Sequence, residues 1–193
     1  MLTLAPDPFA PVALDKAYRL LNHGPTVLVS ARHAGVDNVM AAAWVCPLDF
    51  SPPKVTVVLD KSTLTRELVE ASGGFALQLP TQRMAALTVG VGTDSARAVP
   101  NKLSRHGVVL FQAPGHAVAL VEGCVAWLVC RLVPEPHIQQ THDLFVGEVV
   151  AAWADSRVFS QGRWHFETAP DELRTLHHVA GGHFYAIGQA VNP

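Results

Sequence analysis

The sequence is short of charge and of cysteine, and each shortage excludes a class of protein. Only 16% of the 193 residues are charged, and the formal net charge is −2 with neutral histidines. The chain therefore lacks the basic face that captures nucleic acid. Its three cysteines, Cys46, Cys124 and Cys130, are odd in number and show no CxxC spacing. This argues against a disulfide framework and indicates a reducing compartment.

Signals for secretion and for membrane insertion are also missing. The first residues contain neither a basic segment nor a long apolar stretch, so they do not resemble a secretory signal. The most apolar later stretch, Ala117–Cys130, is interrupted by Glu122 and is too short to span a bilayer. We therefore expect a cytoplasmic protein without a membrane or nucleic-acid partner. Three prolines near the start predict an extended arm over residues 1–13.

The signatures of several other chemistries do not occur. There is no GxSxG motif and no Cys–His family signature, which disfavours a hydrolase. Ten histidines include His165, His177, His178 and His183, but their spacing does not match HExxH and no carboxylate or cysteine completes a set. The run Gly90–Asp94 lacks the Lys-Ser/Thr ending of a Walker sequence and the third glycine of a dinucleotide fingerprint. We expect neither a metal site nor a nucleotide loop.

Apolar residues are plentiful, at 49% of the chain. They supply a core and leave a surplus that favours a homodimer interface. A chain of this length fits one domain, 1–193, because all-β barrels often reach about 200 residues as a single unit. No strand–helix alternation is visible, which favours an antiparallel barrel.

The expected elements follow from periodicity and from turn residues. Strands are predicted over 26–31, 39–45, 55–59, 75–79, 108–111, 118–132, 138–153 and 183–187. Helices are predicted over 14–21, over 63–71 with Ser62 as N-cap, and after Thr81. Residues 90–105 are predicted to form a surface loop.

The segment from Asn38 to Thr65 carries the candidate site. Small side chains at 41–43 would let a flat ring lie close to the backbone, although they would equally suit close packing at a barrel corner. Hydroxyls at 62–65, next to Lys61, begin a predicted helix, where free N–H groups and the positive dipole end favour a phosphate. Ser62 could also be an ordinary cap. Together, a ring slot and a phosphate cradle describe a site for flavin mononucleotide (FMN).

The order of these blocks resembles the flavin-reductase-like family of FMN-binding split barrels, which includes flavoredoxin-like proteins. The matching blocks are Asn38–Trp44, Ser51–Pro53, Lys61–Thr65, Gly74–Phe75 and His142–Val149, followed by Gly181, Gly182 and Tyr185. The resemblance implies a mainly β fold, an antiparallel Greek-key split β-barrel with a few short helices.

The resemblance also implies a cofactor, a reaction and partners. NADH or NADPH would transfer hydride to bound FMN, which would pass electrons to free flavin, ferric iron or a partner oxygenase. Relatives place the flavin between two subunits, so a homodimer is expected. A non-enzymatic FMN electron carrier or sensor is the main alternative, and a barrel that binds haem or pyridoxine phosphate is a second.

Individual residues receive roles by the same resemblance. The expected cofactor-binding residues are Asn38, Met40, Ala41, Ala42, Ala43, Trp44, Lys61, Ser62, Thr63, Thr65 and Gln78. Asn38 could instead be a turn residue and Trp44 a core residue. Gln78 stands where the family often has asparagine. His142 is expected on the nicotinamide side as the catalytic residue, with a strand-end surface position as its alternative.

Overall fold

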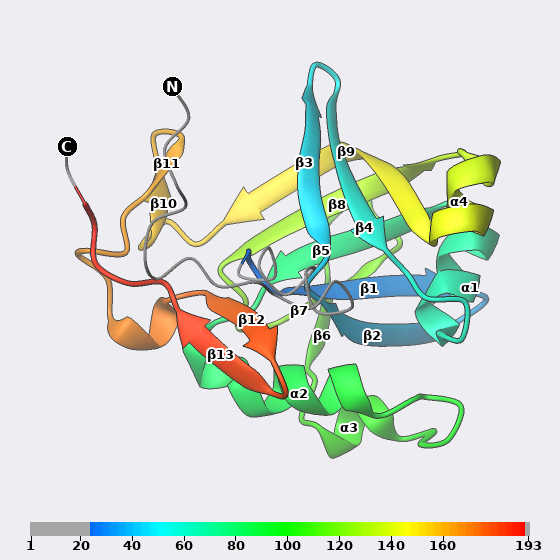
Figure 1. Cartoon of the computed structure of the whole chain (residues 1–193), viewed down its shortest axis with the longest axis horizontal. Coiled ribbons are helices and arrows are strands. Elements are labelled where there is room, and N and C mark those ends of the chain that lie inside the picture. The colour runs from blue at the N-terminus through cyan, green and yellow to red at the C-terminus, as the bar shows by residue number, and fades with distance from the viewer. Residues whose placement is uncertain (1–23, 192–193) are drawn as a thin grey trace, which may run out of the picture.

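A computed structural model describes residues 24–191 (Figure 1). The predicted arm at 1–13 and helix at 14–21 lie outside these residues. The first hairpin pairs β1 (Val27–His33) with β2 (Val36–Ala42) in antiparallel register. Ala34 and Gly35 form its two-residue turn, with φ of 49° and 80°. Positive φ at both positions matches the right-handed twist of the flanking strands, which is what a tight hairpin requires.

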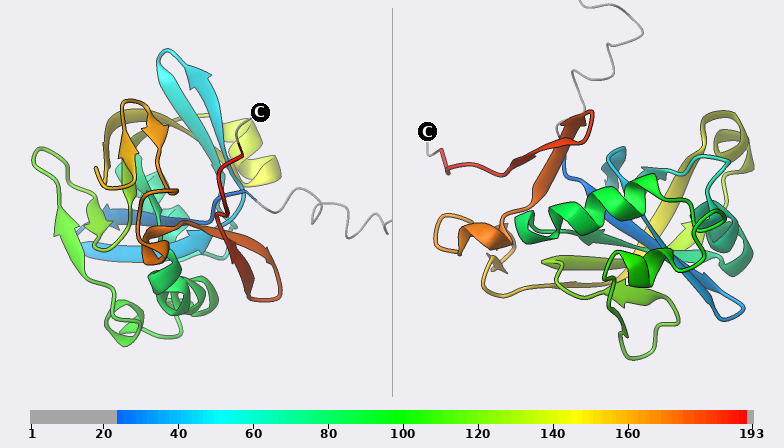
Figure 2. Two further views of the ribbon diagram at one scale, coloured as in Figure 1. Left: turned by 90° about the vertical axis from the view of Figure 1, so that its left-hand side faces the viewer. Right: turned by 90° about the horizontal axis from the view of Figure 1, so that it is seen from below.

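Seven strands form one antiparallel sheet in the order β2-β1-β5-β8-β9-β4-β3. The remaining strands of this sheet are β3 (Val45–Phe50), β4 (Pro53–Val58), β5 (Gly74–Leu79), β8 (Ala126–Val133) and β9 (Leu144–Ala154). The two end strands, β2 and β3, are consecutive in sequence and are separated only by Ala43 and Trp44. The sheet must therefore curl until its edges meet at that point, which gives the split barrel (Figures 1 and 2). The expected fold class is confirmed.

The barrel interior is filled by alternating side chains of several strands. Val29, Val57, Phe75 and Phe145 are fully buried and belong to one cluster. A side chain at Gly147 would collide with the Phe75 ring, so the glycine makes room for that ring inside the barrel. These side chains pack the interior of the barrel as a hydrophobic core.

Short elements surround the barrel. The helices are α1 (Leu64–Ser72), η2 (Gln82–Met84), α2 (Ala85–Thr93), α3 (Lys102–Arg105), α4 (Pro136–His142) and η3 (Asp171–Leu173). The small strands are β6 (Leu110–Gln112), β7 (Ala119–Val121), β10 (Phe159–Ser160), β11 (Arg163–Trp164), β12 (Leu176–Ala180) and β13 (His183–Ala186). Figures 1 and 2 show α2 crossing one face of the sheet beside β2, with the β12–β13 hairpin next to it.

Several predicted elements need correction. Residues 90–105 are not one surface loop, because they contain the end of α2 and all of α3. Residues 138–142 are helical rather than extended, and β9 begins only at Leu144. The N-cap of α1 is Thr63, whose hydroxyl accepts from the Arg66 N–H at 3.4 Å, and not Ser62. Thr81 precedes η2 but makes no side-chain capping bond.

Candidate functional site

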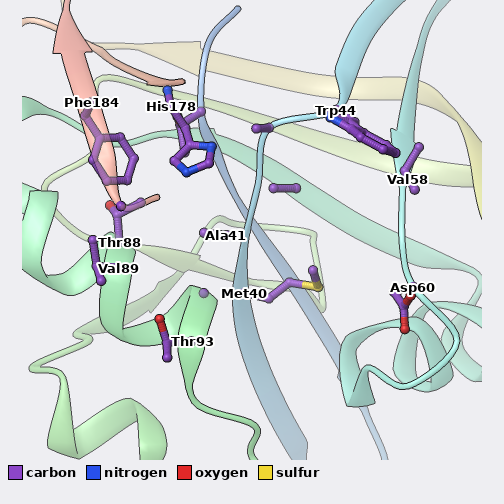
Figure 3. A pocket seen from close by; sticks show the side chains of 15 residues that line it. Met40, Ala41, Trp44, Val58, Asp60, Thr88, Val89, Thr93, His178 and Phe184 are labelled. Atoms are coloured by element: carbon purple, nitrogen blue, oxygen red, sulfur yellow. The ribbon is translucent and has the colours of Figure 1, made fainter. Parts of the chain in front are cut away.

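A cavity of about 510 Å³ lies outside the barrel where the sheet edges meet (Figure 3). Its floor is formed by the end of β2 and by the connection to β3, from Met40 to Trp44. Thr88, Val89 and Thr93 of α2 lie on one side. The structure therefore places five of the predicted cofactor-binding residues, 40–44, around one cavity.

Small side chains determine the shape of this cavity. A Cβ at Gly92 would lie 3.1 Å from the Ala41 Cβ, so α2 approaches β2 more closely than a larger residue would allow. Ala42 and Ala43 continue the same wall. Trp44 is 52% exposed at the cavity edge, so the interpretation of Trp44 as a core residue is wrong. The result is a cavity with one wall of small side chains and with the Trp44 ring at its edge.

Two further aromatic rings reach the cavity from the β12–β13 hairpin. His178 and Phe184 line it, and their ring centroids are 5.3 Å apart at an interplanar angle of 61° (Figure 3). The backbone N–H of His178 donates to the Thr26 hydroxyl at 2.9 Å, and this bond connects the hairpin to the barrel. His178 was considered only as a metal ligand, and Phe184 was not expected at the site. The Gly181–Gly182 pair, with φ of 58° and 77°, was the available signal for this turn.

A narrower cavity of about 200 Å³ adjoins the first and shares Met40, Gly92 and Thr93 with it. Asn38, the α1 start at 62–65, the turn at 94–96 and Lys102 line it. The predicted hydroxyl cluster and Asn38, which come from different elements, are thus brought together. Ser62, Thr63 and Thr65 all belong to this lining.

Polar groups converge on the narrower cavity. The Asn38 side-chain amide donates to the Thr65 hydroxyl at 2.8 Å, while the buried Asn38 Oδ1 has no hydrogen-bond partner within residues 24–191. The first-turn N–H groups of Leu64 and Thr65 have no intrahelical acceptor, because a helix leaves its first N–H groups unpaired. An anionic ligand would satisfy these donors.

The Ser62 side chain is held by its neighbour Asp60. The Ser62 backbone N–H and hydroxyl both donate to Asp60 Oδ1, at 2.8 and 2.6 Å. These two bonds hold the pKa of the Asp60 carboxyl below its usual range, and the bond from the hydroxyl has the larger effect. Asp60 itself lines the larger cavity, so an ionised carboxylate belongs to its wall.

Lys102 is the residue of this site that the sequence analysis missed. Its side chain is only 3% exposed and lines the narrower cavity. Burial lowers the pKa of its ammonium, and the nearby Asp94 carboxylate acts in the opposite direction. Within residues 24–191 the ammonium has no hydrogen-bond or ion-pair partner. A surface-loop interpretation of residues 90–105 gave no reason to expect a buried lysine there.

Three predicted site residues lie away from both cavities. Lys61 is exposed and donates to the Gln140 carbonyl at 2.7 Å. Gln78 is fully buried, where its oxygen accepts from the Val121 N–H and its nitrogen donates to Ser30 at 3.0 Å. His142 is the exposed last residue of α4 and not the head of a strand.

Residues 24–191 contain neither a metal-ligand cluster nor a membrane-spanning helix. No group of three or more histidine, cysteine or acidic side chains there is arranged to hold a metal ion. None of the helices in that range combines the length and the apolar character needed to cross a membrane.

Comparison with known proteins identifies the family. The model of the flavin reductase like domain matches residues 19–184. The chain belongs to the flavin reductase-like family. It is 44% identical over 186 residues to protein YddH of Escherichia coli K12, covering 95% of this chain and 97% of YddH.

Solved structures agree with this assignment. The FMN-binding domain of a flavin reductases-like enzyme from Shewanella baltica is 59% identical, with a TM-score of 0.87 over 95% of this chain and 96% of that one. Component B of nitrilotriacetate monooxygenase from Bacillus cereus has a TM-score of 0.74 at 19% identity, covering 100% of this chain and 98% of its own. The latter likeness shows the shared fold alone.

Proposed function

We propose that this family member binds one FMN per chain, with the ring in the larger cavity and the phosphate in the narrower one. The observation that carries the proposal is that the two cavities adjoin and share Met40, Gly92 and Thr93 in their linings. One space is walled by small residues and aromatic rings, and the other holds unsatisfied polar groups. The Shewanella baltica relative, at 59% identity, is itself an FMN-binding domain, which supports the proposal.

The residues present fit each part of that cofactor. The wall at Ala41–Ala43 admits a flat ring against the backbone, where N–H groups can donate to ring carbonyls. The unsatisfied Asn38 Oδ1 can accept from a hydroxyl of the ribityl chain. The first turn of α1 and Lys102 offer donors and positive charge to the phosphate.

The proposed activity is that of an NAD(P)H-dependent flavin oxidoreductase. Bound FMN would supply the hydride-accepting chemistry, while the protein holds and orients the reactants. The larger cavity opens past Trp44, which is half exposed, so a nicotinamide could approach the ring from solvent. The electrons would then pass to free flavin, a ferric complex or a partner oxygenase. The shared fold of the Bacillus cereus monooxygenase component makes the last acceptor worth testing.

An FMN electron carrier or sensor without NAD(P)H activity is the second candidate. Among residues 24–191, the titratable side chains that line the larger cavity are those of Asp60 and His178. Such a lining suits a carrier as well as a reductase, because hydride transfer to a flavin requires no protein acid. Haem or pyridoxine phosphate would require other contacts and would give different absorbance spectra.

The cofactor assignment can be tested by spectrum and titration. The protein as purified should show a flavin spectrum with near one FMN per chain. Replacing Ser62 and Thr65 together by alanine should weaken FMN much more than riboflavin, because only FMN carries the phosphate. Equal weakening of the two ligands would place the phosphate elsewhere.

The reductase assignment can be tested by anaerobic stopped-flow reduction with NADH and with NADPH. His142→Ala and His178→Ala form a matched pair, since His142 was expected on the nicotinamide side and His178 lines the larger cavity. The variant that keeps FMN but slows reduction by about 5- to 150-fold identifies the nicotinamide contact. If neither nucleotide reduces the wild-type flavin, the carrier function holds instead.

A further inference from the structure

One side of the larger cavity is formed by elements other than the small-residue wall. Figure 3 shows His178 and Phe184 together on this side, with Val58 and Asp60 on the opposite side. The lining here comes from the residue before β1, from α2 and from the β12–β13 hairpin. This hairpin corner consists of Thr26, Thr88, Val89, His178, Gly182 and Phe184.

The Thr88 hydroxyl in this corner is a buried polar group without a partner. Thr88 is only 1% exposed, and its oxygen makes no hydrogen bond within residues 24–191. A threonine inside a helix can donate to a backbone carbonyl of the preceding turn, and Thr88 does not. Because burying a hydroxyl without a hydrogen bond is costly, this group points to a ligand that supplies the missing acceptor.

Two aromatic rings complete the hairpin corner. His178 of β12 and Phe184 of β13 are paired directly across the hairpin, and both are half-buried. Their rings meet edge to face, with centroids 5.3 Å apart at an angle of 61°. Gly181 and Gly182, both with positive φ, form the turn between the two strands. The backbone bond from His178 to Thr26 fixes the hairpin against the barrel. A flat ligand can therefore pack against these rings.

The charges of the larger cavity restrict the ligand further. No lysine or arginine among residues 24–191 lines this cavity, whereas the Asp60 carboxylate does. An anionic ligand would find no countercharge there and would be repelled by Asp60. The hairpin corner therefore favours a ligand without charge.

We propose that the hairpin corner binds a small, uncharged, planar carbonyl compound. The ring of this compound packs against Phe184 and His178, and its carbonyl oxygen accepts from the Thr88 hydroxyl. The inference rests on the proposed function, because it takes the flavin ring to lie along residues 40–44 and leaves the hairpin corner for a second ligand. Such a compound differs from NAD(P)H, whose diphosphate has no positive partner in the described lining and must remain outside the cavity.

The test measures binding to the FMN-loaded protein and not turnover. The FMN content is measured first, and the absorbance of the bound flavin is then followed on titration with acetophenone, toluene and benzoate. These probes share one aromatic ring and carry a neutral carbonyl, no oxygen and a negative charge, respectively. The wild type should bind acetophenone about 2- to 12-fold more tightly than toluene, as expected for one neutral hydrogen bond, and should bind benzoate most weakly.

Four variants assign this preference to particular side chains. Thr88→Val removes the hydroxyl and keeps the shape of the side chain, so the protein should keep FMN and lose the preference for acetophenone. Thr88→Ser should restore it. Thr81→Val is the matched control, because the Thr81 hydroxyl is also buried and unpaired within residues 24–191 but does not line the cavity. Phe184→Ala should weaken acetophenone and toluene alike, by about 2- to 12-fold, because the ring packs against both.

Four results would overturn the inference while the proposed function survives. In the first two, the FMN-loaded wild type does not prefer acetophenone to toluene, or binds benzoate as tightly as acetophenone. In the third, Thr81→Val removes the preference as Thr88→Val does. In the fourth, Thr88→Val releases FMN, which would assign the hydroxyl to the cofactor. A wild-type protein that binds no FMN would contradict the proposed function and the inference together.

Discussion

Single side chains decide whether the larger cavity can accept a flat ligand. Ala41, Ala42 and Ala43 are partly buried and form one wall, opposite Gly92 of α2. Because each of these side chains is a single methyl group, the cavity reaches close to the backbone. The half-exposed Trp44 lies where the cavity meets solvent. A larger residue within this run would fill the space that the ring requires, with little effect on the barrel core.

Ala42→Phe should therefore abolish or strongly weaken flavin binding while the protein stays folded. Overfilling a packed site costs about 1–3 kcal/mol, which corresponds to a loss of affinity of about 5- to 150-fold. The measurement is the flavin content after purification, together with the far-UV circular dichroism spectrum. Ala71→Phe, on the exposed part of α1, is the matched control and should keep its flavin. Unchanged flavin content in a folded Ala42→Phe variant would mean that residues 38–44 serve only in packing.

The sequence predicted those site residues that lie in one local block. The small-residue wall and the hydroxyls at 62–65 stand on either side of one hairpin, so their pattern is visible in a short stretch. Lys102 and His178 are brought to the same cavities from distant elements, and no local pattern marks them. Gln78 was misplaced because an amide in a strand can face either side of the sheet. Here it faces away from the barrel core and is buried beneath β7, where its oxygen accepts from the Val121 N–H.

At the level of elements, a short helix after Thr81 was expected, but the end of α2 from Gly90 onward was assigned to a loop, and its glycines explain why. Gly90 and Gly92 are poor helix formers and indicated a loop. Both are required by packing, since Gly92 lets α2 lie against Ala41 and a side chain at Gly90 would overlap with the His106 ring. Tertiary contacts thus outweigh helix propensity in this element. The helix α4 was missed although Pro136 stands in its first turn, a position that proline favours.

The strands were easier to predict than the helices. β1, β2, β4 and β5 follow apolar runs bounded by glycine or proline, and each was found within a few residues of its ends. β3 was not predicted as a strand, because Pro47 interrupts it and its side chains are mostly exposed. An alternation of buried and exposed residues, which reveals a strand, occurs in β4 but not in β3.

Gly90→Ala should disturb the phosphate end of the site through α3. The added methyl group would displace the His106 ring, weaken its contact with Asp94 and move the segment that carries Lys102. FMN affinity should fall several-fold relative to riboflavin affinity. Alanine is also a better helix former by about 1 kcal/mol, so the stability of the variant can remain near that of the wild type.

Fluorescence titration with both ligands, and thermal melting, check this prediction. Gly188→Ala is the control, because no neighbouring atom lies within 4 Å of the added carbon. The double variant Gly90→Ala/His106→Ala removes the overlap and also the bond to Asp94, so it should not restore FMN selectivity. A Gly90→Ala protein with wild-type selectivity and a higher melting temperature would show that the close contact has no role in the site.

At the level of the whole molecule, the β3–β4 hairpin projects from the barrel (Figures 1 and 2). Near its tip, Phe50 is 99% exposed and Leu48 is 55% exposed. β3 is also an end strand of the sheet order. Exposed apolar side chains on an end strand invite association, and natural proteins usually protect such edges. A second copy of the chain is the simplest cover, which agrees with the homodimer that the family resemblance implies.

We therefore predict a homodimer that depends on this hairpin. Sedimentation of the wild-type protein at micromolar concentration should give about twice the chain mass of 20.7 kDa. An interface of obligate type buries more than about 2,000 Å² in total and is largely apolar. Two unpaired charges placed within it should therefore disrupt the dimer. Leu48→Asp combined with Phe50→Asp should therefore sediment as a monomer. Val109 lies outside the hairpin and is 55% exposed, as Leu48 is, so the Val109→Asp variant should remain dimeric.

The flavin content of the separated species then shows whether the site needs both subunits. Neither Leu48 nor Phe50 lines the two cavities. A monomeric double variant that loses FMN would therefore show that the partner subunit completes the site, whereas retained FMN would show that one chain suffices. A wild-type protein that sediments at 20.7 kDa would contradict the dimer and the shared site together. A double variant that stays dimeric would place the interface on another face, because two buried aspartates per chain could not be accommodated at the hairpin without a large loss of affinity.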